Sequence, residues 1–214
     1  MMSEEHAVKV SVCVVTYNQE AYLDECLRSL IAQSVSFSYE IIVGDDASTD
    51  GTRKIIESYR ERFPDLIVPV YHDENVGAIK NIVSVYRKAR GQYIAHLDGD
   101  DYAAPSKLAK QVEILDANPD CTLCAHDVVT VDKASRELKR KARFSKSEKK
   151  GRDFLIANLP FFAHSSKMFR SDVSCGYYDE LPDDSTDFEL HLRHLKDGRV
   201  YFIAEFLGFY RVFA

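Results

Sequence analysis

Long apolar runs are missing from this sequence of 214 residues. A helix that crosses a bilayer needs about 20 consecutive apolar residues, and no run approaches that length. The first ten residues, MMSEEHAVKV, also lack the apolar core of a secretory signal. The composition, with 45% hydrophobic and 29% charged residues, is typical of a soluble globular protein. We therefore expect one folded domain that stays in the cytoplasm.

Cysteine is scarce, and its pattern argues against disulfides and zinc. The five cysteines are an odd number, and Cys13 and Cys26 fall inside apolar patterns that predict buried, reduced thiols. Cys121 and Cys124 form a CxxC motif, but a zinc site would need a second pair of ligands. A redox motif would open a helix, whereas this pair lies in the strand-like CTLCAHDVV. The sequence therefore disfavours both metal and dithiol chemistry at this motif.

An excess of positive charge is missing as well. The formal net charge is −6, which argues against nucleic acid as the main partner because phosphate backbones are held by surplus Lys and Arg. The charge is uneven, however: residues 133–152 contain ten basic and two acidic residues, so the remainder of the chain carries −14. We expect this basic segment to be a solvated loop or an exposed helix. The alternative is peripheral contact with anionic lipid headgroups at the inner face of the cell membrane, or with a lipid-phosphate acceptor.

Strands and helices alternate through the first half of the sequence. Apolar, β-branched segments predict buried strands at 8–15, 40–44, 66–72 and 93–97. Helical periodicity and capping residues between them predict helices, for example at 52–62 and 77–90. Such alternation implies right-handed crossovers and a mostly parallel sheet with helices on both faces. After residue 119 the alternation breaks, and we expect a strand at 121–131 and a helix at 187–196.

Polar side chains follow each of the four predicted strands. They are Thr16, Tyr17 and Asn18, then Asp45 and Asp46, then His72 and Asp73, and finally Asp98, Asp100 and Asp101. In parallel sheets, ligands bind beyond the carboxyl ends of the strands, so these groups are expected to share one edge. Each cluster alone is also explained by a helix cap or an Asp-Gly turn. Their common location favours a binding site.

The crowded carboxylates in AHLDGDDY, residues 95–102, predict a bound cation. Carboxylates this close raise one another's pKa unless positive charge lies among them. Without Cys and with few His, such a group suits Mg²⁺ or Mn²⁺, which keep waters and also bind substrate phosphates. The first strand is followed by neither GxGxxG nor GxxxxGK[ST], the loops that hold phosphates in dinucleotide-binding and P-loop folds. We therefore expect a metal on a diphosphate to do what backbone amides do in those folds.

Three motifs together resemble the family 2 glycosyltransferases of GT-A fold. They are TYN within VSVCVVTYNQEAYLDECLRSLIAQS, DDASTDGT within YEIIVGDDASTDGT, and LDGDD within GQYIAHLDGDDY, in this order and spacing. The close match covers about residues 8–120, and TDFELHLRHLKDGRVYFI is similar to the family's acidic helix. The resemblance implies a single GT-A domain over 1–214, an α/β Rossmann-like sandwich with a mostly parallel sheet. Residues 8–120 would form its nucleotide-sugar-binding half and 121–214 its acceptor-side half.

The resemblance also implies roles for particular residues on the donor side. The residues expected to bind the nucleotide are Thr16, Tyr17, Asn18, Asp46 and Asp98. Among them, Asp46 would hydrogen-bond the base, and Asp98 would approach the ribose or metal-bound waters. Asp100 would hold Mn²⁺ or Mg²⁺ on the diphosphate, and Asp101 would support either role.

The family's catalytic base aligns with Asp187. Thr186 stands where the family usually has a glutamate, and Asp183 and Asp184 lie just upstream as alternative carboxylates for the base. The resemblance implies an inverting reaction: the base takes a proton from an acceptor hydroxyl, and the oxygen attacks the anomeric carbon in line. The metal neutralises charge on the departing nucleoside diphosphate.

The donor expected from the resemblance is a nucleotide sugar, with a UDP-sugar preferred, and the acceptor is a glycan or a lipid-linked molecule. One alternative is a sugar nucleotidyltransferase, although the glycine- and lysine-rich phosphate loop of such enzymes is not found. Another is a non-catalytic nucleotide-sugar-binding module of a larger synthase, which Thr186 and Phe213 motivate. Phe213 follows a Tyr-Arg pair in GFYRVFA, where many family members continue to a histidine. This ending predicts either a truncated chain or an altered acceptor site.

The histidines have several expected environments. His96 lies inside a predicted strand, where a hydrogen-bonded core residue is favoured. His164, in FFAHSSKMF, lies in a region where the resembling family places acceptor-side residues. His191 and His194 have the i, i+3 spacing of metal ligands, but no third ligand is evident. We therefore expect these two on a plain helical surface.

Overall fold

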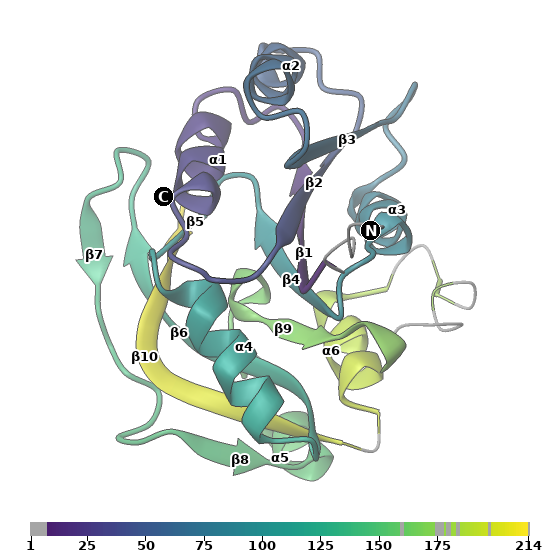
Figure 1. Ribbon diagram of the computed structural model, residues 1–214. Helices are drawn as coiled ribbons and strands as arrows, with labels where there is room; N and C mark the ends of the chain where they lie inside the picture. The colour runs from purple at the N-terminus through teal and green to yellow at the C-terminus, as the bar shows by residue number, and fades with distance from the viewer. Residues whose placement is uncertain are drawn as a thin grey trace.

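The computed structural model describes residues 8–158, 161–173, 178, 181–182, 185–196 and 198–213. In these residues ten strands form one mixed sheet, with helices packed on both of its faces (Figure 1). The α/β architecture expected from the sequence is therefore confirmed. Asp183 and Asp184, the alternative carboxylates for the base, lie outside the described residues.

One half of the sheet is parallel, as the alternating pattern predicted. Its strands lie side by side in the order β3 (Ile67–Tyr71), β2 (Tyr39–Asp45), β1 (Val10–Thr16) and β4 (Tyr93–Asp98). The register places Thr16 beside Asp45 of β2, and Val15 beside Asp98 of β4. The carboxyl ends of β1, β2 and β4 therefore meet, and the polar residues that follow them share one edge of the sheet.

The other half joins strands that are far apart in the sequence. β9 (Met168–Arg170) runs antiparallel between β4 and β6 (Cys121–Val131), and β6 pairs in parallel with β10 (Arg199–Arg211). The short strands at the edges are β5 (Tyr102–Ala103) and β8 (Glu148–Lys150), which pair with β10, and β7 (Glu137–Lys139), which pairs with β6. In Figure 1 the long, curved β10 brings the end of the chain back beside the first helix.

Amphipathic helices cover the sheet. They are α1 (Leu23–Ile31), α2 (Thr52–Arg62), α3 (Ala78–Lys88), α4 (Lys107–Ala117), α5 (Arg152–Ala157) and α6 (Asp187–Leu195), with short 3₁₀ turns η1 (His164–Ser166) and η2 (Ser171–Val173). In α1, for example, Leu23, Leu27 and Leu30 recur at helical spacing and are buried. No helix in the described part of the chain is long and apolar enough to cross a bilayer.

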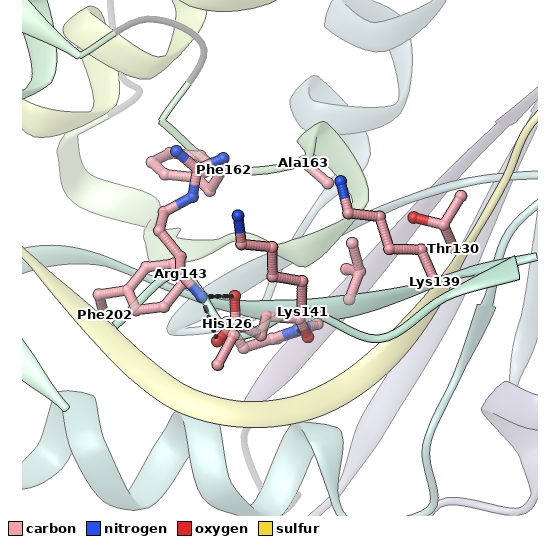
Figure 2. Close-up of a pocket in the computed structure, with 11 residues that line it drawn as sticks. His126, Thr130, Lys139, Lys141, Arg143, Phe162, Ala163 and Phe202 are labelled. Atoms are coloured by element: carbon pink, nitrogen blue, oxygen red, sulfur yellow. Dashed lines mark hydrogen bonds between the residues drawn. The ribbon is translucent and has the colours of Figure 1, made fainter. Parts of the chain in front are cut away.

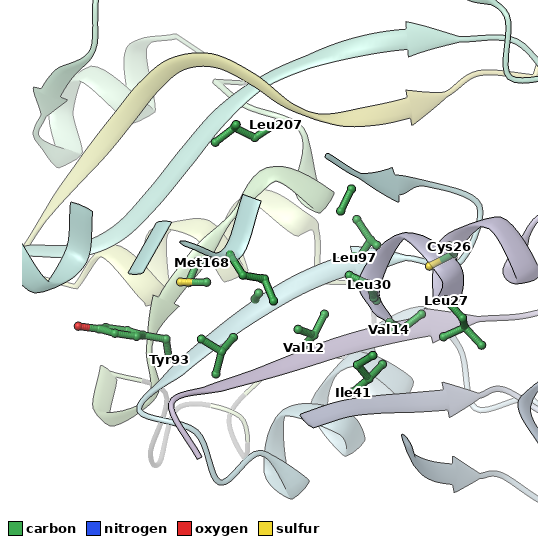
Figure 3. Packing of buried hydrophobic residues seen from close by; sticks show 14 of the residues in the cluster. Val12, Val14, Cys26, Leu27, Leu30, Ile41, Tyr93, Leu97, Met168 and Leu207 are labelled. Carbon is green, nitrogen blue, oxygen red and sulfur yellow. The ribbon is translucent and has the colours of Figure 1, made fainter. Parts of the chain in front are cut away.

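Alternate side chains of the central strands enter two hydrophobic layers. In β1, Val12 and Val14 pack in one cluster with Leu27 of α1 (Figure 3), whereas Cys13 packs in the other cluster with Val85 of α3. Burying one such aliphatic side chain stabilises the fold by about 1.5–3 kcal/mol. Cys13 and Cys26 are buried and free, as predicted, and so are Cys121 and Cys124.

The basic segment 133–152 is extended rather than helical. A loop or an exposed helix was expected, and most of the segment is a loop, but it also contains the short strands β7 and β8, and α5 begins only at its last residue. Backbone pairing explains the difference, because Thr130 of β6 pairs with Lys139 and Val200 of β10 pairs with Lys150. Most side chains of the segment remain exposed, as the prediction of a solvated segment required.

A buried carboxylate ties together the strands of the parallel half. Glu40 of β2 is 2% exposed and accepts a hydrogen bond from Ser11 Oγ of β1 at 2.6 Å. It also accepts from the backbone N–H, Nε and Nη2 of Arg90, which precedes β4, at 3.1, 3.0 and 2.6 Å. Burial raises the pKa of Glu40, but the bonds from Arg90 and Ser11 outweigh burial and hold the pKa below its ordinary value. Glu40 is therefore charged in the folded protein.

Replacing Glu40 by Gln is expected to lower the free energy of unfolding by about 2 kcal/mol at pH 7, because the charge-assisted bonds from Arg90 are lost. A folded-state pKa below the ordinary value means that this contribution is complete above the ordinary pKa and disappears as the pH falls through the folded-state pKa. Urea unfolding of wild type and E40Q from pH 7 downward measures both effects. E137Q is the control, since Glu137 pairs with Arg140 at an exposed site and should change stability by less than about 0.5 kcal/mol. Equal losses in the two variants would contradict the assignment.

Candidate functional site

A cleft of about 540 Å³ lies at the carboxyl ends of β1, β2 and β4. Loops after these strands, the start of α3 and the end of β10 form its walls. The lining residues are Val15, Thr16, Tyr17, Gln19, Asp46, Asn75, Gly77, Ala78, Asn81, Asp98, Asp100, Asp101, Tyr210, Arg211 and Phe213. All of the residues expected to bind nucleotide or metal line this cleft, with the exception of Asn18.

The carboxylate of Asp98 is held from two sides. His96 Nε2 lies 3.1 Å from Asp98 Oδ1, and Ser165 Oγ donates to Asp98 Oδ2 at 2.8 Å. An ionised carboxylate only accepts, so His96 Nε2 carries the proton and His96 Nδ1 accepts from the Tyr86 O–H at 2.9 Å. Burial raises the pKa of Asp98, but the contacts with His96 and Ser165 hold it below its ordinary value. Asp98 is therefore charged, and its orientation is fixed.

The two carboxylates that follow have raised pKa values. Burial and the charge of Asp98 raise the pKa of Asp101 to about 8, and the same two causes raise the pKa of Asp100. Asp101 is 2% exposed, and its Oδ1 accepts from the Arg211 backbone N–H at 2.8 Å. Within the described part of the chain, Asp101 Oδ2 has no hydrogen-bond partner. Mutual repulsion of this kind is relieved when a cation binds nearby.

Gly99 allows the turn between these carboxylates to pass close to β1. A Cβ atom at Gly99 would lie 2.6 Å from Gln19 Oε1 and 2.9 Å from Thr16 Cβ. Both distances are too short for a side chain, so glycine is required for steric reasons. The glycine between Asp98 and Asp100 is therefore explained by its close packing against Thr16 and Gln19.

Arg211, near the end of β10, anchors the turn that carries Asp100 and Asp101. Its Nε donates to the Asp100 carbonyl at 2.7 Å, and its Nη2 pairs with Glu25 of α1 at 2.7 Å. Its Nη1 donates to the Asp132 carbonyl at 2.8 Å. The Arg211 side chain is 1% exposed. Its rigid fork of N–H donors therefore joins three parts of the chain in one buried contact.

The carboxylates do not form a closed metal site by themselves. No group of three or more His, Cys, Asp or Glu side chains in the described residues is arranged to hold a metal ion. Both oxygen atoms of Asp98 already have protein partners, whereas Asp100 lines the cleft and carries a pKa raised by Asp98. These residues fit Mg²⁺ or Mn²⁺ bound by one or two protein carboxylates, with the remaining ligands from phosphates and water.

The residues after β1 divide between the cleft and the neighbouring loop. Tyr17 is 46% exposed, so its ring is open to a ligand in the cleft. Thr16 lines the cleft below it, whereas Asn18 has a φ of 52° and faces the loop after β2. Asn18 Oδ1 accepts from the Thr49 N–H at 2.8 Å, and the Asn18 N–H donates to Ser48 Oγ at 2.9 Å. Asn18 therefore fixes the backbone near the cleft but does not line it.

Asp46 holds the loop that forms the opposite wall. Its Oδ1 accepts from the Val76 N–H at 2.7 Å, and its Oδ2 accepts from the Gly77 N–H at 3.0 Å. Gly77 has a φ of +89°, a conformation that favours glycine. Each carboxylate oxygen keeps a further lone pair, so Asp46 still has capacity to accept from a nucleobase.

Unpaired buried oxygen atoms gather in this cleft. Thr16 Oγ1, Gln19 Oε1, Asn81 Oδ1 and Asp101 Oδ2 are buried and, among the described residues, have no hydrogen-bond partner. All four belong to lining residues. Leaving a buried polar group unpaired costs about 1–3 kcal/mol. The cleft is therefore suited to a ligand that brings N–H or O–H donors, or a cation.

Asp187, the expected base, is the first residue of α6 and does not line the cleft. Its side chain is 61% exposed, and its Oδ1 lies 3.7 Å from His164 Nδ1. Thr186, which stands in place of the family's usual glutamate, forms a capping box with Glu189, whose Oε2 accepts from the Thr186 N–H at 3.0 Å. Thr186 therefore stabilises the start of the helix that presents Asp187.

The turn η1 connects Asp187 with the carboxylate edge. His164 of this turn lies beside Asp187, and the next residue, Ser165, donates to Asp98. His164 is 6% exposed, and burial lowers its pKa well below the ordinary value, so its ring is neutral. The expected base and the donor-side carboxylate thus lie on either side of one short turn.

His191 and His194 do not lie on a plain helical surface, contrary to the prediction. They are 5% and 1% exposed. His191 Nε2 lies 3.1 Å from His164 Nδ1, and the His194 ring stacks on Phe169 of β9 with centroids 3.7 Å apart. The i, i+3 spacing placed both rings on one face of α6, and that face packs on the sheet. Burial lowers the pKa of both rings well below the ordinary value, so they are neutral packing groups.

Several site residues were missed by the sequence analysis. They are Gln19, Asn81 and Ser165. Tyr210 and Arg211 were noted as the Tyr-Arg pair before Phe213, but they were given no role in the site. Gln19 directly follows the TYN motif, and Asn81 is a polar residue on the buried face of α3, so each had a local signal. Ser165 and Arg211 reach the site through strand pairing between distant segments. Nothing in their local sequence indicates that contact.

The sequence matches the family described as Glycosyl transferase family 2 over residues 11–175. This match covers most of the chain, and the chain therefore belongs to glycosyl transferase family 2, as the motifs predicted. An uncharacterized protein of Mycobacterium tuberculosis is 36% identical over 205 residues, which are 94% of this chain and 58% of the relative. The chain thus spans little more than half the length of that relative.

Solved structures show the same fold. TarS of S. aureus in complex with UDP matches with a TM-score of 0.77 at 24% identity, over 96% of this chain and 61% of TarS. The mannosyltransferase PcManGT from Pyrobaculum calidifontis, in complex with GDP-Man and Mn²⁺, matches with a TM-score of 0.66 at 22% identity, over 94% of this chain and 58% of that protein. At these identities the likeness establishes the fold alone, and the expected GT-A fold is confirmed.

Replacing Arg211 by Lys tests the anchor of the carboxylate turn. A lysine keeps the charge but loses the fork, so we expect the free energy of unfolding to fall by about 2–3 kcal/mol. Arg136→Lys is the matched control, because Arg136 is exposed and pairs with Asp132 on the neighbouring turn. The control should change stability by less than about 0.5 kcal/mol. Thermal or urea unfolding measures both, and an unaffected Arg211→Lys would contradict the anchoring role.

Proposed function

We propose that this chain transfers a sugar from a nucleotide-sugar donor to a hydroxyl group of an acceptor. The observation that carries the proposal is the composition of the cleft, where the exposed ring of Tyr17 lies with the carboxylates of Asp98 and Asp100 at the carboxyl ends of the strands. An aromatic face suits a nucleobase, and carboxylates suit ribose hydroxyls and a metal-bound diphosphate. Membership of family 2 supports the same reaction.

The donor's nucleoside is expected to lie in the part of the cleft between Tyr17 and Asp46. Its base would stack on the Tyr17 ring and donate to Asp46, whose carboxylate oxygens keep lone pairs. The unpaired oxygens of Thr16 and Asn81 add further acceptors for N–H or O–H groups. A UDP-sugar is the preferred donor, since the better-matching fold relative has been solved with UDP and UDP-GlcNAc. PcManGT, solved with GDP-Man, makes a GDP-sugar the second choice.

Asp100 is the residue proposed to hold Mn²⁺ or Mg²⁺ at the diphosphate. When bound, the ion neutralises negative charge on the departing nucleoside diphosphate. Asp98, charged and fixed by His96 and Ser165, is proposed to accept from the ribose or from metal-bound water. Asp101 is buried and bonded to the Arg211 backbone, so its proposed part is to position Asp100.

Asp187 is the proposed general base. Its carboxylate is exposed at the start of α6, and it reaches η1, the turn that also holds Asp98. A carboxylate so placed can take the proton of an acceptor hydroxyl while the oxygen attacks the anomeric carbon, which inverts that centre. The acceptor is proposed to be a glycan or a lipid-linked molecule. The described part of residues 121–214 is proposed to provide the acceptor-side surface around the base.

Calorimetric titration with UDP, GDP and dTDP, each with and without Mn²⁺, tests the donor site. We expect UDP to bind in the presence of Mn²⁺, and Asp100→Asn to weaken that binding by at least about tenfold because a charged ligand is lost. Asp73→Asn, which removes an exposed carboxylate after β3, is the control and should bind UDP as the wild type does. If no nucleotide binds to the wild type under any condition, the proposed donor site is rejected.

Asp187→Asn tests the base. The variant should lower the kcat of sugar transfer by about 10²–10⁴-fold, because the proton acceptor is lost. Its affinity for UDP should be unchanged, since Asp187 does not line the donor cleft. Release of nucleoside diphosphate from a bound sugar donor, on addition of candidate acceptors, measures the transfer. Glu189→Gln, on the same helical turn, is the control and should keep transfer despite a weaker capping box. Equal activity of Asp187→Asn and wild type would exclude Asp187 as the base.

A further inference from the structure

A second hollow, of about 420 Å³, lies in the acceptor-side half of the chain (Figure 2). It is bounded by β6, by residues 139–143 of the basic segment and by the chain at Phe162 and Ala163. It shares no lining residue with the donor cleft. We call it the basic pocket. Its polar lining comes mainly from Asp127, Thr130, Lys139, Lys141 and Arg143.

Three cationic side chains line one wall of the basic pocket. Lys139, Lys141 and Arg143 are spaced two residues apart, and side chains of an extended chain alternate between its two sides. All three therefore face the same way. In Figure 2 they extend together toward Phe162 and Ala163.

The intervening arginine has a different environment. Arg140 does not line the pocket, pairs with Glu137 at 2.8 Å and lies over the Phe206 ring at 5.2 Å. Lys139 and Lys141, by contrast, form no ion pair with any of the residues that the structure describes. Arg140, which is paired with Glu137, thus lies outside the pocket, whereas Lys139 and Lys141 line it and can contact a ligand.

Asp127 is the acidic member of the pocket lining, and its carboxylate binds the backbone of the pocket wall. Both of its carboxylate oxygens accept from the Arg143 backbone N–H, at 3.0 and 3.2 Å. Asp127 is 6% exposed, and burial raises its pKa above the ordinary value. The lining therefore carries a net positive charge. Asp127 also fixes the backbone from which the Arg143 side chain extends.

The basic pocket and the donor cleft are close along the chain. Ala163 lines the basic pocket, and Ser165, two residues later, donates to Asp98 in the donor cleft. Two residues span at most about 7 Å. Phe162 of the pocket also packs on the His191 ring, with centroids 4.3 Å apart, on the helix that begins with Asp187. A residue that lines the pocket therefore contacts the helix of the proposed base, one helical turn from Asp187.

We propose that the basic pocket binds a phosphate group carried by the acceptor. This inference rests on the proposed function, and it names a chemical class for the acceptor: a phosphorylated glycan or a phosphate-linked lipid carrier. A phosphate offers several oxygens that can accept at once from the two ammonium groups and the guanidinium of Arg143. The hydroxyl of Thr130 provides a further donor in the same hollow.

The shape of the pocket favours a phosphate group over a flat membrane surface. Lys139, Lys141 and Arg143 line one wall of a hollow, and the aromatic side chains of Phe162 and Phe202 line it as well. The segment between Lys139 and Arg143 contains no large apolar side chain that could enter a bilayer. A single group of concentrated negative charge matches this arrangement.

Titration with a phosphomonoester tests the basic pocket directly. Glycerol 3-phosphate is added to protein already saturated with UDP and Mn²⁺, so that the donor cleft is filled, and binding is followed by calorimetry. The wild type should show saturable binding. The double variant K139Q/K141Q should bind about thirtyfold more weakly, as expected for the loss of two lysines near a phosphate. UDP affinity, measured on the same samples, should be unchanged.

The matched control is R136Q/R140Q, which removes two positive charges from the same segment at positions outside the pocket. It should bind glycerol 3-phosphate as the wild type does. If both double variants bind glycerol 3-phosphate equally weakly, the proposed phosphate site is overturned. It is also overturned if the wild type binds UDP but does not bind glycerol 3-phosphate. Lysine-dependent phosphate binding by a protein that does not bind UDP would instead overturn the proposed function and leave the pocket standing.

A second arm identifies the source of the phosphate. Co-sedimentation uses phosphatidylcholine vesicles with and without phosphatidic acid, which presents a phosphomonoester at the surface. Binding that requires phosphatidic acid and is lost in K139Q/K141Q supports a lipid carrier. Lysine-dependent binding of glycerol 3-phosphate without vesicle binding supports a soluble phosphorylated glycan. Vesicle binding that R136Q/R140Q reduces as much as K139Q/K141Q would show a diffuse surface charge and overturn the proposal.

Discussion

The buried guanidinium of Arg211 is the contact on which the carboxylate edge depends. Three aspartates within four residues repel one another, and the turn that holds them is kept in place from β10, by the Arg211 backbone N–H on Asp101 and the Arg211 side chain on the Asp100 carbonyl. The same guanidinium reaches Glu25 of α1. The contact between Arg211 of β10 and Glu25 of α1 therefore helps to fix the turn that carries Asp100 and Asp101, although this turn belongs to neither element. The strand β10 is part of the site for this reason.

Two buried lysines, Lys107 and Lys167, lie near the carboxylate of Asp98. Lys107 Nζ donates to the Ser165 carbonyl at 2.6 Å, and burial lowers the pKa of Lys107 to about 8. Lys167 is fully buried as well, and burial lowers its pKa to about 7. Burial raises the pKa of Asp98, whereas its contacts with His96 and Ser165 and the charge of Lys167 lower it, and the neutral ring of His96 gives it a directed hydrogen bond. Of the three carboxylates at this edge, Asp98 is the one whose pKa these contacts hold below its ordinary value, whereas burial and the charge of Asp98 raise the pKa values of Asp100 and Asp101.

Local features of the sequence were sufficient to predict the parallel half of the sheet and several residues that line the cleft at the carboxyl ends of its strands. Strand periodicity and the rule that parallel strands meet at their carboxyl ends place Thr16, Asp46 and Asp98 together without any long-range information. The contact between Arg211 and Asp101 spans 110 residues, and no local pattern specifies such a pairing. Periodicity also groups His191 and His194 on one face of α6 but does not say whether that face is buried. The extended form of the basic segment has the same origin, since β6 and β10 provide its hydrogen-bond partners.

The two hollows are lined by side chains of opposite charge, and we propose that this difference orients the acceptor. In the proposed reaction, Lys139 and Lys141 attract the phosphate of the acceptor to the basic pocket, while its reacting hydroxyl approaches Asp187. The turn η1 lies between the two hollows: its Ser165 donates to Asp98, and its His164 lies beside Asp187. Binding energy from the phosphate is then used for positioning the hydroxyl near the anomeric carbon, which is where binding contributes most to rate. In this proposal, an acceptor without the phosphate lacks the orientation, so the basic pocket contributes to specificity as well as to affinity.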